Sequence, residues 1–213
     1  MHDIAEGQCG DELAALRQRV AELERILEMT RELTSALTLR PLLSKIAETA
    51  RELTNSVGAS ILLLDEEANE LRFMVATNYP SGSLGEIPVP IERSIAGAIL
   101  TSRQPMIVSD VQSHPRFYPE VDRLTDFTCR SLIGVPLQIH DRCIGVMEAP
   151  NKQGGQEFTQ KDVETLTTLA AQITIALENA RLYQEVSDHA EQLEERVRER
   201  TAELQVRNEE LAA

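Results

Sequence analysis

The sequence lacks several features that would place it in common protein classes. It contains no Trp, and aromatic residues make up only 3% of its 213 residues. Its core must therefore be built mainly from Leu, Ile, Val and Ala, which agrees with an apolar content of 42%. No apolar run reaches the length of a transmembrane helix, and the polar, acidic residues 1–10 show no signal-peptide pattern.

Basic residues are also scarce. Lys and Arg number 21 against 35 Asp and Glu, which gives a formal net charge of −14. This balance disfavours binding to nucleic acid and to anionic membrane surfaces. The three cysteines, Cys9, Cys129 and Cys143, are far apart without CxxC spacing, which is typical of free thiols inside cells. We therefore expect a soluble cytoplasmic protein.

Both ends of the chain carry apolar residues at helical spacing. Residues 11–38 predict a coiled-coil helix, with a seam formed by Leu13, Leu16, Val20, Leu23, Leu27, Thr30, Thr34 and Leu37. No Gly or Pro follows residue 155, so a helix that begins after Thr159 could exceed 50 residues. Its last part, 184–213, continues the seam with a stutter at Leu193, Val197 and Thr201. Because a single chain cannot cover both seams, we expect a parallel homodimer.

The middle of the chain, 39–183, has the periodicity of a mixed α and β domain. Pro41 fits the first turn of a helix that runs to about Val57, with Gly58 as its C-terminal cap. Strands are expected at 59–65, 71–76, 105–108, 131–139 and 143–149, and a short helix at 94–101. The segments 81–90 and 110–128 are expected to be loops, the second with a helical turn.

Four motifs in this region resemble those of the GAF domain family. They are Ser94-Ile95-Ala96-Gly97, the stretch from Asp110 through His114 to Phe117 and Tyr118, the stretch 127–137 that includes Cys129, and the set Asn151, Lys152, Phe158 and Asp162. The tail 193–204 resembles the signalling helix that connects GAF or PAS sensors to histidine kinases and cyclases. The resemblance implies an α+β fold: a six-stranded antiparallel sheet with helices on one face, a ligand pocket on the other, and flanking coiled-coil helices.

The resemblance also implies where a ligand would bind. In cyclic-nucleotide GAF domains the region of Ser94–Gly97 holds a phosphate, because a helix N-terminus offers free N–H groups to an anion. An ordinary Ser-capped helix would explain the same residues. The candidate ligand contacts also include Asp110, His114, Phe117 and Tyr118, in the loop expected to form the pocket lid, and Cys129 after it. Phe117 and Tyr118 could stack on a flat ligand, or simply anchor the loop. A small molecule is expected, with a cyclic nucleotide as the leading candidate.

The remaining candidate residues are better explained by structural roles than by ligand binding or catalysis. Phe158 and Asp162 fit a hydrophobic staple and a capping box at the start of the long helix, and Lys152 could pair with Asp162. His114 has no second His near it in sequence, so no metal site is predicted. Cys129 is expected to act as a small apolar residue at the start of a core strand.

These observations predict a dimeric sensory module without a catalytic set of its own. It would bind a small ligand and relay the change through its helices to a histidine kinase or cyclase output. A ligand-free scaffold for dimerisation and protein contacts is the first alternative. The second is a thiol-dependent reductase of free methionine sulfoxide. The Ser94–Gly97 segment lacks the Cys that this reductase family has there.

Overall fold

The computed structural model describes residues 36–77, 87–125 and 127–212. The chain divides into two compact units, Met1–Leu39 and Arg40–Ala213. The coiled-coil helix predicted over 11–38 lies outside the described residues, except for its last three, which begin helix α2 (Ala36–Leu53).

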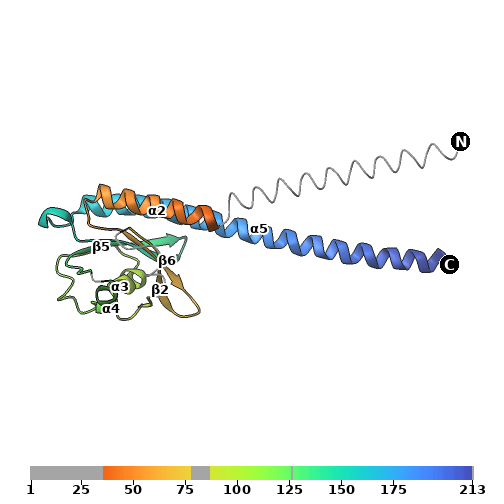
Figure 1. The fold of residues 1–213 in the computed structure, drawn as a ribbon, viewed down its shortest axis with the longest axis horizontal. Helices are drawn as coiled ribbons and strands as arrows, with labels where there is room; N and C mark the ends of the chain where they lie inside the picture. The colour runs from red at the N-terminus through yellow and green to blue at the C-terminus, as the bar shows by residue number, and fades with distance from the viewer. Residues whose placement is uncertain (1–35, 78–86, 126, 213) are drawn as a thin grey trace. The chain divides into compact units, whose positions relative to one another are not determined.

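A six-stranded antiparallel sheet forms the centre of the second unit (Figure 1). Its strands are β1 (Ser60–Asp65), β2 (Glu70–Ala76), β3 (Val89–Pro90), β4 (Met106–Val108), β5 (Leu132–Ile139) and β6 (Arg142–Pro150). They lie in the order β3-β2-β1-β6-β5-β4. The predicted α+β fold is thereby confirmed, and β6 lies at the middle of the sheet between β1 and β5.

Two tight turns fix the hairpins of this sheet. Asn69, before β2, and His140, between β5 and β6, adopt the left-handed conformation with φ of 54° and 51°. Asn tolerates this conformation better than most residues. Asp65 also accepts a hydrogen bond from the Ala68 amide, which closes the first turn. Both turns fall where polar sequences interrupt the apolar strands.

Helices lie on both faces of the sheet. Figure 1 shows α2 and the long α5 (Gln160–Ala212) together on one face, and α3 (Ile95–Ser102) and α4 (Pro119–Thr125) on the other. A short 3-10 helix, η1 (Gln153–Gly155), connects β6 to α5. The short helix α3 lies where the sequence predicted one at 94–101, and α3 and α4 cover the opposite face only in part.

Three local expectations were wrong. Pro41 lies inside α2 and not in its first turn, because the helix begins at Ala36. The helix ends at Leu53, and the reversal falls on Asn55 (φ 51°) instead of Gly58. The expected loop 81–90 contains β3, whose two residues pair with Glu70 and Leu71 at the edge of the sheet. Two paired residues are too few to leave a periodic pattern.

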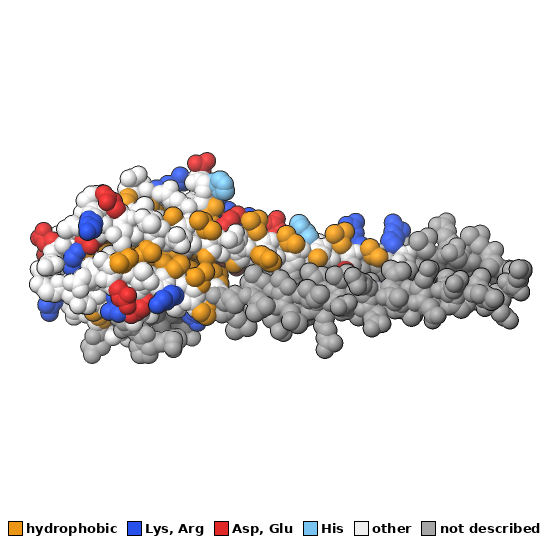
Figure 2. Space-filling view, turned by 90° about the horizontal axis from the view of Figure 1, so that it is seen from above, with side chains coloured by type: hydrophobic (Ala, Val, Ile, Leu, Met, Phe, Trp, Pro, Cys, Tyr) orange, Lys and Arg blue, Asp and Glu red, His pale blue; other side chains and the backbone are white. Residues whose placement is uncertain are grey.

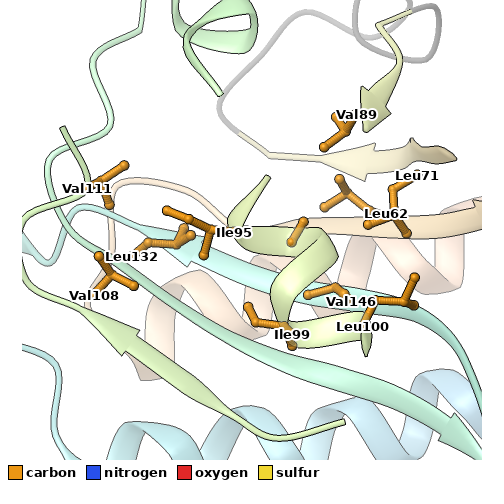
Figure 3. Close-up of a cluster of buried hydrophobic side chains, with 11 residues drawn as sticks. Leu62, Leu71, Val89, Ile95, Ile99, Leu100, Val108, Val111, Leu132 and Val146 are labelled. Carbon is orange, nitrogen blue, oxygen red and sulfur yellow. The ribbon is translucent and has the colours of Figure 1, made fainter. Parts of the chain in front are cut away.

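The face toward α5 is filled with apolar side chains. Met147 and Ala149 of β6 are fully buried, as are Leu166 and Ile173 of α5. Since successive side chains of a strand point to opposite faces, Val146 and Glu148 of β6 point toward α3 instead. The apolar cluster on that side is drawn in Figure 3 and consists of Leu62, Leu71, Val89, Ile95, Ala96, Ile99, Leu100, Val108, Val111, Leu132 and Val146.

Candidate functional site

A cavity of about 90 Å³ lies on the α3 face of the sheet. It is bounded by the sheet, by the start of α3 and by the lid, which we define as residues 110–125 and 127–130. Its lining residues are Ser60, Leu62, Phe73, Val89, Ser94, Ile95, Ala96, Val111, Phe117, Tyr118, Val121, Asp122, Phe127, Cys129, Leu132, Glu148 and Pro150. A volume of this size can hold several water molecules or part of a small organic molecule.

The start of α3 closes one side of the cavity, where Ser94, Ile95 and Ala96 line it. The Ser94 hydroxyl accepts a hydrogen bond from the Gly97 amide at 2.9 Å and donates one to the Pro90 carbonyl at 2.6 Å. Ser94 is therefore a conventional N-cap whose side chain is fully engaged. Gly97 does not line the cavity; a Cβ at this position would lie 1.9 Å from the Ile91 carbonyl oxygen. Close packing of the helix on that backbone explains the glycine without a phosphate.

The lid brings only part of its predicted set to the cavity. Phe117 and Tyr118 line it, together with Cys129. Asp110 is exposed and accepts a hydrogen bond from the Ser113 hydroxyl at 2.6 Å. The Nδ1 atom of His114 accepts one from the Arg116 amide at 3.2 Å. Asp110 and His114 thus shape the lid backbone and do not reach the cavity.

Three polar lining residues were not predicted, and Glu148 is the most unusual of them. It lies two residues before the end of β6, paired with Ser60 of β1 and Gly134 of β5, and only 9% of it is exposed. Within the described residues, no hydrogen bond or ion pair engages its carboxyl group. Burial raises the pKa of this carboxyl to about 7. At neutral pH the group therefore exchanges between its neutral and ionised forms.

Ser60 and Asp122 are the other two. Ser60 is buried at 6% exposure, and no hydrogen bond of its hydroxyl is found among the described residues. Asp122 of α4 accepts hydrogen bonds from the Cys129 amide at 2.9 Å and from the Gln112 side chain at 3.2 Å. Burial raises the pKa of Asp122, and these two hydrogen bonds oppose the rise. Asp122 thus holds the end of the lid while its carboxyl faces the cavity.

The two cysteines in the described part of the chain are in poor environments for thiolate chemistry. Burial raises the pKa of the Cys129 thiol, and the nearby Glu148 and Asp122 carboxylates raise it further. Burial also raises the pKa of Cys143, at the start of β6, whose thiol donates a hydrogen bond to the Gly145 carbonyl at 3.4 Å. A reactive cysteine requires the opposite shift, toward a lower pKa.

Sequence reasoning missed Glu148 although a signal was present. The strand Val146-Met147-Glu148-Ala149-Pro150 is apolar except for this one residue. An acidic side chain within a central strand is rarely buried without a partner. Such a residue therefore indicates either a buried ion pair or hydrogen bond, or a ligand-binding site. Asp122 gave no such signal, because a carboxylate in a polar loop is ordinary.

The Asn151-Lys152-Phe158-Asp162 set connects the lid to the start of α5. Asn151, with φ of 52°, accepts hydrogen bonds from the Arg130 and Ser131 amides and donates one to the Thr128 carbonyl. Lys152 forms a buried ion pair with Asp162 at 2.5 Å, and its ammonium lies 5.4 Å from the centre of the Phe158 ring.

Asp162 also caps the helix. Its carboxylate accepts hydrogen bonds from the Thr159 amide and hydroxyl at 2.7 and 2.8 Å. The first of these is the reciprocal bond of a capping box, made by Asp in place of the usual Glu. The set therefore fixes the root of α5 to the end of β6 and does not line the cavity.

Two kinds of site are absent from the described residues. No group of three or more His, Cys, Asp and Glu side chains there is arranged to hold a metal ion. No helix within those residues is both long and apolar enough to cross a membrane.

Comparison with known proteins identifies the fold. The GAF domain family model matches residues 36–178, so the chain belongs to the GAF domain family. The GAF domain of a phosphoenolpyruvate-protein phosphotransferase from Acinetobacter superposes with a TM-score of 0.60 at 21% identity. The match covers 78% of this chain and 98% of that one. At this identity the likeness shows the fold alone.

Two curated relatives are signalling proteins. One is the dual 3′,5′-cyclic-AMP and -GMP phosphodiesterase 11A of Takifugu rubripes, 28% identical over 76% of this chain. The other is the circadian input-output histidine kinase CikA of Thermosynechococcus vestitus, 28% identical over 90% of this chain. The matches span only 19% and 28% of the relatives' own lengths. The chain thus carries a GAF domain related to those of sensor kinases and phosphodiesterases.

Proposed function

We propose that this chain is a dimeric sensory module that binds a small molecule in the α3-face cavity and relays binding through α5. The observation that carries the proposal is the cavity itself. It is open, and it contains buried polar groups that no described residue satisfies. Buried polar groups without partners cost free energy, so such a cavity is better explained by a ligand than by packing alone. A scaffold kept only for dimerisation would be expected to fill the space with side chains.

A continuous set of contacts supports the relay. Asp122 holds the Cys129 amide at the end of the lid, and Asn151 holds the backbone of residues 128–131. The next residue, Lys152, is paired with Asp162 in the first turn of α5. A ligand that orders or displaces the lid would therefore act on the root of α5 through a few hydrogen bonds. Contiguity supports coupling and does not measure it.

An exposed apolar stripe on α5 supports the dimer. The stripe consists of Ile175, Leu182, Val186, Leu193 and Val197, which are exposed by 62%, 45%, 67%, 60% and 63%. Figure 2 shows hydrophobic side chains spaced along this helix. Steps of seven and four residues are those of a coiled-coil seam. We assign the stripe to α5 of a second copy, since an identical helix carries the matching seam.

The dimer can be tested by light scattering on two single variants at neighbouring positions of α5. Leu193→Glu places a charge in the stripe and is expected to shift the protein toward monomer. Gln192→Glu adds the same charge at a neighbouring exposed position and should leave the dimer intact. A wild-type protein that is monomeric at micromolar concentration would overturn the dimer proposal.

Ligand binding can be tested by a thermal-shift screen with cyclic nucleotides, nitrate, amines and common metabolites. A ligand at about 100 times its Kd adds roughly 2.7 kcal/mol of stability, which is readily detected. A saturable shift would support the sensor. No shift from any compound, with the dimer intact, would favour the scaffold instead. For the relay, Leu193→Pro should alter ligand affinity; equal affinity would contradict coupling between cavity and helix.

We also propose that the output is a kinase or cyclase, joined to this chain or acting on it as a separate partner. Two observations support this output. The curated relatives are a phosphodiesterase and a histidine kinase, and residues 193–204 resemble a signalling helix. For the chain itself we propose no catalysis, because the pKa of both described thiols is raised. Methionine sulfoxide reduction that is lost in a Cys129→Ser, Cys143→Ser double variant would overturn this view.

A further inference from the structure

Two buried polar side chains face each other across β1 and β6 without partners. Ser60 and Glu148 are directly opposite in the strand register, and they are 6% and 9% exposed. Both line the cavity. Within the described residues, neither the hydroxyl nor the carboxyl makes a hydrogen bond or an ion pair. A molecule in the cavity would therefore meet one strong acceptor group and one hydroxyl at the floor.

The charge of the lining has a single sign. Glu148 comes from the sheet and Asp122 from α4, and no Lys, Arg or His is among the lining residues. Cys129 and Tyr118, from the lid, are the other titratable groups there; β1, β5 and α3 contribute none. A bound anion would be repelled by both carboxylates, and Ser94 already caps the helix end that could attract one.

The rest of the lining is apolar and partly aromatic. Phe73 of β2 and Phe117, Tyr118 and Phe127 of the lid border the space, with Leu62 and Val89 between them. Aromatic faces attract both flat apolar groups and cations. The cavity thus combines an acidic floor with a wall suited to a ring or a short alkyl chain.

We propose that the cavity binds a small protonated amine with a compact apolar body, the nitrogen contacting Glu148 and Ser60 and the body packing under the lid. This inference rests on the proposed function, since it names the ligand class of the same cavity. It replaces the cyclic nucleotide that the family resemblance implied, because the Glu148 and Asp122 carboxylates would repel the phosphate of such a ligand.

The first test uses the full chain and two probes of matched shape and opposite charge, phenethylammonium and 3-phenylpropionate. In calorimetry or thermal shift, phenethylammonium is expected to bind saturably and 3-phenylpropionate is not. Equal binding of both probes, or a preference for the carboxylate, would overturn the proposal. This comparison needs no substitution and so does not depend on any variant folding.

The second test is Glu148→Gln, with Glu164→Gln as the control on the exposed side of α5. Glu148→Gln should weaken phenethylammonium binding by at least about tenfold, as expected for a lost buried charge pair. Glu164→Gln should leave the binding unchanged. Because the Glu148 pKa is about 7, binding to the wild type should strengthen roughly tenfold between about pH 6 and pH 8. Unchanged affinity in Glu148→Gln would overturn the assignment.

The two proposals fail in different ways. If neither probe binds but cyclic AMP or another anion does, the amine assignment is wrong and the sensory function stands. If no compound in the screen binds, the amine assignment and the sensory function both fail, and the GAF fold here serves dimerisation.

Discussion

The two faces of the central sheet are built from the same strands but differ in how completely they are filled. Toward α5, Met147, Ala149, Leu166 and Ile173 pack with almost no exposed surface. Toward α3, the alternate residues of the same strands leave a cavity with a buried carboxyl at its floor. One strand, β6, supplies Met147 to the first face and Glu148 to the second.

This difference separates the two tasks of the domain. The α5 face fixes the long helix, so its side chains pack tightly and the buried Lys152–Asp162 pair at the root of the helix is complete. The α3 face retains unpaired polar groups, which lower stability but provide contacts for a ligand. The packing on the α5 face stabilises the fold, and the unpaired polar groups on the α3 face offset part of that stability. Such a loss of stability is common at functional sites.

The largest expected effect concerns the charge pair on the filled face. Lys152→Met would leave Asp162 buried without its partner, and we expect a loss of about 3–5 kcal/mol in the free energy of unfolding. Chemical denaturation at fixed protein concentration measures this loss. The double variant Lys152→Met, Asp162→Leu should recover part of it, because no charge then remains buried. A single variant as stable as the wild type would show that the root of α5 does not depend on the pair.

Matched truncations compare the two faces directly. Leu166→Ala on the filled face should cost about 4 kcal/mol, because it opens a new hole among fully buried side chains. Leu132→Ala, at the edge of the cavity, should cost nearer 2 kcal/mol, because the space it opens joins one that already exists. Denaturation midpoints of the two variants give the comparison. Equal losses would indicate that the α3 face is as tightly packed as the other.

The last expected effect depends on pH and has the opposite sign. The folded-state pKa of Glu148 is raised from 4.5 to about 7. Its contribution to stability is therefore present below about pH 4.5 and is lost as pH rises through about 7. Glu148→Gln should be up to about 3 kcal/mol more stable than the wild type at pH 8, and similar to it near pH 4.5. Urea denaturation across this range measures the difference; a constant difference would mean that Glu148 is partnered in solution.

Much of the fold could be predicted from the sequence. Strands that are short, mostly apolar runs bounded by polar turns, such as β1, β5 and β6, were located within a residue or two. The start of α5 was also predicted, because Thr159 and Asp162 have the spacing of a cap. Pro41 misled the prediction, since proline is common in the first turn of a helix and rare in the interior, where α2 contains it.

The site was predictable only where the family motifs reach it. Ser94, Phe117, Tyr118 and Cys129 lie at the cavity, whereas Asp110 and His114 share their motif but face elsewhere. Glu148 comes from a different part of the chain, and its role arises from its pairing between β1 and β5. Such a placement depends on sheet register, which a single sequence does not specify.

The length of α5 has a mechanical consequence for a module of this kind. From Asp162 to Ala212 the helix rises by about 75 Å, at about 1.5 Å per residue. No Gly or Pro interrupts it. A tilt of about 5° at its root would move its far end by roughly 6 Å, if a second helix keeps it straight. A displacement of a fraction of an ångström beside Lys152 would therefore move the C-terminal end of α5 by more than the pitch of one helical turn, about 5.4 Å.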